Sequence, residues 1–203
     1  MAKIRELAES TMQKPKDFRI TLQQDGSAFE TLADILPEQG SLKMLMVQMP
    51  PSERSVAAGH YFRTKTGITF WNLLAEYNIL DIPFGVYEDE MLLDHGYGMI
   101  HIHKVPSEIF GELNGNHYRM ALLELLGLIH KHKPKVLLFI YKKILDKILR
   151  LSFGLDLKAK YGFNPELERY FGARVFVFPL PQGHCEPADV ADYMQALSNC
   201  LKS

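Results

Sequence analysis

The sequence predicts an α/β fold, a three-layer α/β/α sandwich around a short, mostly parallel four-stranded sheet. Short apolar runs alternate with segments of helical period along most of the 203 residues. The runs are too continuously apolar for a sheet with one face in water, which favours parallel strands covered by helices on both faces. The expected strands cover residues 42–47, 99–103, 136–140 and 174–178.

Three further elements are expected ahead of the first of these strands. Residues 3–12 have the pattern of a short helix, and residues 18–23 alternate apolar and polar side chains in the way typical of a strand or an extended arm. Ser27 and Glu30 have the spacing of a capping box, so we expect a helix from Ser27 to about Leu36.

Amphipathic segments between and after the strands predict the helices. Each of them repeats apolar side chains at intervals of three and four residues, which places those side chains on one face. Helices in these positions would form the crossover connections that a parallel sheet requires. They are expected at residues 70–77, at 87–93, at 116–131, at 142–151, from Asn164 onward, and from Glu186-Pro187 to about Leu201.

The composition indicates an ordinary globular protein. We expect one domain over residues 41–203 with an N-terminal extension, residues 1–40, packed on it. A net charge of -1 gives no sign of a general nucleic-acid binder, and two cysteines cannot form a four-thiolate metal site, so no metal and no cofactor are expected. With neither a signal peptide nor a run of about 20 apolar residues, we expect a cytoplasmic monomer without a membrane partner.

The first place to look for a binding site follows Val47. The apolar run there stops at Pro50-Pro51, because proline cannot donate to a strand ladder. A polar loop, the aromatic motif at residues 59–62 and Phe70-Trp71 come next. Open α/β sheets bind ligands outside the carboxyl ends of their strands, which is where this loop would lie.

Several passages, in their order and spacing, resemble motifs of the uracil-DNA glycosylase superfamily, most closely those of the mismatch-specific uracil/thymine-DNA glycosylases. No single match is specific; their order and their strand–loop context carry the resemblance, which extends from about Leu42 to the C-terminus. The passages are VQMPP at 47–51, SVAAGHYF at 55–62, ITFW at 68–71, LLDHGYGMIHI at 92–102, the strand with its flanks at 133–143, and FPLPQGHC at 178–185.

The resemblance implies a DNA glycosylase of base excision repair. Such an enzyme flips uracil or a related damaged or mismatched base out of single- or double-stranded DNA and hydrolyses its N-glycosidic bond. Polar positions on which the family relies are held here by Met49, Ile68, Leu180 and the pair Ile100-His101. This leaves two alternatives open: a catalytically silent member that binds nucleic acid or a nucleobase, and an enzyme acting on another N-glycoside.

The candidate site residues come from these motifs. Glu53, the first carboxylate after the strand, and His101, whose neutral imidazole could donate to a base oxygen or shuttle a proton, are the candidate catalytic residues. The base pocket is expected to comprise Gln48, Met49, Pro50, His60, Tyr61, Phe62 and Leu180. Contacts with DNA are expected from Ser52, Arg54, Ser55, Gln182, Gly183 and His184. The lysines between residues 131 and 147 are more typical of a solvated helix face than of a DNA track.

Overall fold

The protein has an α/β fold around a mostly parallel central sheet of five strands. The computed structural model describes residues 15–24, 26–106, 113–180 and 185–203, and the structural statements below concern these residues. The strand order is β4-β3-β5-β7-β6. The strands are β3 (Met44–Gln48), β4 (Tyr97–His101), β5 (Val136–Phe139), β6 (Gly162–Phe163) and β7 (Arg174–Val177).

The prediction of four strands was wrong by one. The four expected strands are present, and they pair in parallel as β4-β3-β5-β7. The fifth, β6, adds to β7 in antiparallel orientation and has only two residues, Gly162 and Phe163. A segment of two residues cannot establish a period, so the sequence pattern gave no sign of it.

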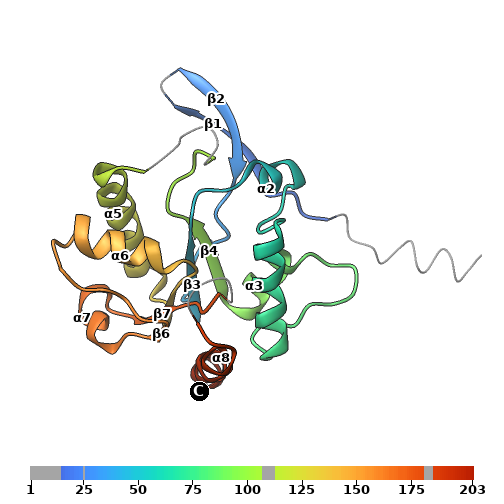
Figure 1. Ribbon diagram of the computed structural model, residues 1–203. Coiled ribbons are helices and arrows are strands. Elements are labelled where there is room, and N and C mark those ends of the chain that lie inside the picture. Colours follow the sequence, from blue (N-terminus) through green and yellow to red (C-terminus); the bar gives the residue numbers. More distant parts are fainter. Residues whose placement is uncertain (1–14, 25, 107–112, 181–184) are drawn as a thin grey trace, which may run out of the picture.

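Helices cover both faces of this sheet. Figure 1 shows α5 and α6 on one side and α3 on the other. The longer helices lie where expected, and α6 has the predicted bounds, whereas residues 88–91 and 93–95 form two 3-10 turns in place of one short helix. The helices are α2 (Glu53–Ala58), α3 (Lys65–Glu76), α5 (Gly115–His132), α6 (Lys142–Leu151), α7 (Glu168–Phe171) and α8 (Pro187–Lys202).

The core follows from the alternation of side chains along the strands. Met44 and Met46 of β3 belong to an apolar cluster that includes Trp71 of α3 and residues of α8. Leu45 and Val47, on the opposite face of β3, belong to a second cluster with α5 and α6. β3 is buried on both faces, and its residues 44–47 are all apolar, as is typical of a parallel strand covered by helices on both sides.

The prediction of a helix from Ser27 was wrong, because residues Ser27–Leu32 form strand β2. It pairs in antiparallel register with β1 (Arg19–Gln24), so that Leu22 lies opposite Phe29. The Asp-Gly dipeptide before Ser27 is a typical hairpin signal, and Gly26 has a φ of 79° that only glycine adopts at little cost. Pairing along the whole of β1 therefore outweighs a capping-box spacing, which needs only two residues to match.

The segment after the hairpin joins the outer edge of β4. Ile35 and Met99 each donate a backbone N–H to the other's carbonyl at 2.9 Å, which forms an antiparallel bridge. Phe18, Leu32 and Ile35 are buried in the cluster around α3. The division of the chain at residue 40 stays a prediction, and the helix expected at residues 3–12 lies outside the described residues. None of the described helices has the length and hydropathy needed to cross a membrane.

Candidate functional site

The order of the parallel strands creates a crevice beside β3. Along the sheet, the second, first, third and fourth of these strands follow one another. The connections that leave the neighbouring strands β3 and β5 cover opposite faces, through α3 and α6. In open α/β sheets, ligands bind where the order reverses in this way, outside the carboxyl ends. A cavity of about 80 Å³ lies there, lined by Gln48, Met49, Pro50, Pro51, Ser52, Ser55, Phe62, Thr64, His101 and Tyr141. We call it the β3–β4 cavity.

A buried polar pair, Gln48 and His101, lies at this cavity. The two residues are opposite each other in the pairing of β3 with β4, and Gln48 Nε2 donates to His101 Nε2 over 2.9 Å. An imidazole that accepts at Nε2 carries its proton on Nδ1. His101 Nδ1 is buried and has no hydrogen-bond partner among the described residues, so this donor is unused.

The environment of His101 keeps it uncharged. Burial first, and the charge of Lys104 second, hold the pKa of this histidine well below its usual range. The Tyr61 ring stacks on the imidazole with 4.7 Å between centroids and 18° between planes, and its hydroxyl donates to the Ala33 carbonyl. Tyr61 thus supports His101 from behind and is not one of the residues that line the cavity.

Phe62 forms an apolar wall of the cavity. Its backbone has a φ of 56°, in the left-handed region, and its ring packs on Phe70 with centroids 5.0 Å apart. The first turn of α3 lies so close that a Cβ on Gly67 would overlap the Phe62 carbonyl oxygen. The absence of a side chain at Gly67 therefore allows Phe62 to take this position.

His60 has a different environment from the one expected. Its Nδ1 donates to Asp89 Oδ1 at 3.0 Å, and Tyr87 stacks on its ring with centroids 3.6 Å apart. Asp89 Oδ2 accepts the Tyr61 N–H at 2.7 Å. Burial raises the pKa of the Asp89 carboxyl, while these two donors lower it. The pair ties residues 59–62 to the 3-10 turn, and sequence reasoning missed Asp89 because a lone carboxylate carries no motif.

The loop expected after Pro51 contains a short helix, α2, which separates its polar residues into two groups. Ser52 caps the helix by accepting the Ser55 N–H at 3.3 Å, and both serines line the cavity. Glu53 and Arg54 are exposed and are not among the lining residues. In the described part of the chain, no carboxylate lines the β3–β4 cavity.

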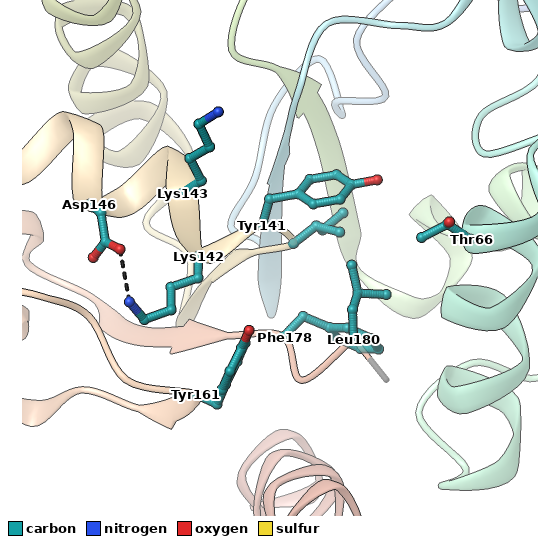
Figure 2. A pocket seen from close by; sticks show the side chains of 9 residues that line it. Thr66, Tyr141, Lys142, Lys143, Asp146, Tyr161, Phe178 and Leu180 are labelled. Carbon is teal, nitrogen blue, oxygen red and sulfur yellow. Dashed lines mark hydrogen bonds and ion pairs between the residues drawn. The ribbon is translucent and has the colours of Figure 1, made fainter. Parts of the chain in front are cut away.

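A larger cavity, of about 440 Å³, lies at the carboxyl ends of β5 and β7. Tyr141 lines both cavities, and Figure 2 shows its ring extending from the start of α6 toward Thr66 on the opposite wall. Leu180 lines this cavity and not the smaller one. Asp146 is held by Lys142 Nζ at 2.8 Å and by a backbone N–H. The lining residues are Thr66, Ile140, Tyr141, Lys142, Lys143, Asp146, Tyr161, Phe178 and Leu180.

Part of the residue set expected from the sequence lines the β3–β4 cavity. Seven of the expected residues line the β3–β4 cavity: Gln48, Met49, Pro50, Ser52, Ser55, Phe62 and His101. Gln182, Gly183 and His184 lie outside the described residues. Thr64 and Tyr141 were missed. Tyr141 follows the strand at 136–140 directly, so applying the carboxyl-end rule to that strand as well would have found it.

Comparisons with known proteins add no assignment. The sequence matches no protein-family model and none of the curated proteins. Within the described residues there is also no group of three or more histidine, cysteine, aspartate or glutamate side chains placed to hold a metal ion.

Proposed function

We propose that this chain has a uracil-DNA glycosylase-like fold and binds a nucleobase, presented by DNA, in the β3–β4 cavity. The observation that carries the proposal is the buried Gln48–His101 pair with its unused Nδ1–H donor. An amide and a neutral imidazole offer hydrogen-bonding groups to the polar edge of a base, and Phe62 offers an apolar wall for its ring.

Binding without hydrolysis is the better supported form of this function. Cleavage of an N-glycosidic bond needs a group that positions or activates water. Met49, at the position where the family resemblance implies such a group, is a thioether and at best a weak acceptor. Glu53 is exposed, and no carboxylate lines the β3–β4 cavity in the described part of the chain.

A DNA N-glycosylase of base excision repair is the second candidate, and His101 favours it. The negative charge that develops on a departing base falls on its carbonyl oxygen. A buried, neutral imidazole with a proton on Nδ1 is a suitable donor to that oxygen. In this form of the proposal His101 would be the catalytic residue and Glu53 would not take part.

The test compares the wild type with the double variant Gln48→Met/His101→Phe. This variant removes both polar groups with little change in volume, and replacing both partners of a buried hydrogen bond can be nearly neutral for stability. The control is Glu53→Gln, an exposed residue beside the site. Affinity is measured by fluorescence anisotropy on strands carrying uracil, thymine or an abasic position, and cleavage by alkali treatment of the products.

We expect the wild type and Glu53→Gln to bind the uracil strand at least about tenfold more tightly than the abasic strand, a difference of about 1.4 kcal/mol. The double variant should lose this preference and keep its fold by circular dichroism. Equal affinity of the wild type for all three strands would overturn base binding. Strand cleavage that His101→Phe alone abolishes would establish the second candidate in place of the first.

A further inference from the structure

A groove of about 280 Å³ runs along α6 and the segment that follows it. Four basic side chains line it, together with two carboxylates: Lys143, Lys147, Arg150 and Lys158, with Asp146 and Asp156. We call it the α6 groove. Its charge is local, because the whole chain carries a net charge of only -1.

Three of the basic residues form a row. Lys143, Lys147 and Arg150 follow one another at intervals of four and three residues, which places them on one face of α6. With a helical rise of about 1.5 Å per residue, the row extends over roughly 10 Å. The Asp146 carboxylate accepts from Lys142 Nζ and from the Ala159 N–H, so its charge is already balanced. The groove therefore presents an excess of positive charge.

The α6 groove continues into the larger cavity at the carboxyl edge of the sheet. Lys143 and Asp146 line both. Two tyrosines, Tyr141 and Tyr161, line the cavity, and Figure 2 shows them on different walls beside Lys142. A positive groove next to aromatic side chains is the arrangement with which proteins bind single-stranded nucleic acid, since it takes up phosphates and stacks unpaired bases.

We propose that the α6 groove binds the phosphate backbone of a single-stranded nucleic acid, and that Tyr141 and Tyr161 stack its bases. The proposal deepens the proposed function and rests on it for the identity of the partner, although contact with the backbone needs no particular base. It reverses the expectation from sequence that Lys143 and Lys147 belong to a merely solvated helix face. A duplex fits less well, because its paired bases could not reach the two tyrosines.

The test neutralises the exposed residues Lys143 and Arg150 in the variant Lys143→Gln/Arg150→Gln. The control, Lys131→Gln/Lys202→Gln, removes the same charge from exposed positions in the last turns of α5 and α8. The probes are labelled oligothymidine, oligouridine, an abasic strand and a duplex. Affinity is measured over a series of salt concentrations, because the slope of log affinity against log salt counts phosphate contacts.

We expect the groove variant to lower this slope by about 1.4 on every single strand, the abasic one included, because each contact contributes about 0.7. The control should keep the parent slope. Tyr161→Leu should weaken binding to strands with bases by roughly tenfold and leave the slope unchanged. Equal slopes in the groove variant and the control would overturn the proposal, as would tighter binding of the duplex than of single strands.

Failure of this proposal can be told apart from failure of the proposed function. If Gln48→Met/His101→Phe removes a preference for uracil while the groove variant keeps the parent slope, base binding stands and the α6 groove does not bind the phosphate backbone. If the groove variant lowers the slope but no strand shows a base preference, the groove stands and the proposed base site does not.

Discussion

The burial of His101 predicts how stability responds to acid. The pKa of this histidine in the folded protein lies well below the ordinary value of 6.5. As the pH falls below about 6.5, the unfolded chain takes up a proton at this residue and the folded protein does not. The free energy of unfolding should therefore decrease by about 1.4 kcal/mol per pH unit from His101 alone, until the folded pKa is reached. Above about pH 7 the contribution vanishes, because both states are neutral.

Urea unfolding at about pH 7.5 and about pH 5.5 measures this effect. Gln48→Met/His101→Phe is the matched comparison, because the other histidines contribute to both proteins and cancel in the difference. At about pH 5.5, one unit below the ordinary histidine pKa, the free energy of unfolding of the wild type should have fallen by about 1.4 kcal/mol more than that of the variant. Identical losses in the two proteins, or a His101 ring resonance that titrates with a midpoint near 6.5 in an NMR experiment, would refute this reasoning.

Three further predictions concern stability, each measured by chemical denaturation. Asp89→Ala leaves the Tyr61 N–H and a histidine proton buried without an acceptor, so it should cost about 3–5 kcal/mol, and a loss no larger than that of an exposed acid would contradict the pairing. Gly67→Ala should cost about 2–3 kcal/mol by forcing the backbone of Phe62 away, and an unchanged stability would contradict this close contact. Gly127→Ala, at an open position in α5, should instead raise stability by about 0.5–1 kcal/mol; a decrease would argue against the helix there.

The parts of the fold that could be predicted are those in which one local signal dominates. The run at 136–140 has no polar residue, so a doubly buried strand was the natural interpretation, and β5 confirms it. The amphipathic period at 142–151 gave α6 its bounds. The prediction for residues 27–32 was wrong because the capping-box spacing favoured a helix. The segment forms a strand by pairing with β1, and a pattern within the segment does not reveal that partner.

The candidate site, like the fold, has one part that could be predicted from the sequence and one that could not. That residues after Val47 would line a cavity followed from a general rule about parallel sheets. The hydrogen bond of Gln48 to His101 could not be predicted, because it depends on β3 and β4 being neighbours in one particular register. The role of His60 was equally hidden, since its partner Asp89 is 29 residues away along the chain.

The bridge between Ile35 and Met99 affects whether copies of this chain can associate through the edge of β4. A sheet strand with free outer N–H and C=O groups is a template on which another chain can add, and it invites aggregation. Here the segment that follows the β1–β2 hairpin occupies part of that template on β4. A protein shortened to begin at residue 41 would lose this cover and expose β4 to self-association. The stretch around Ile35 therefore limits how readily copies of this chain can polymerise through β4.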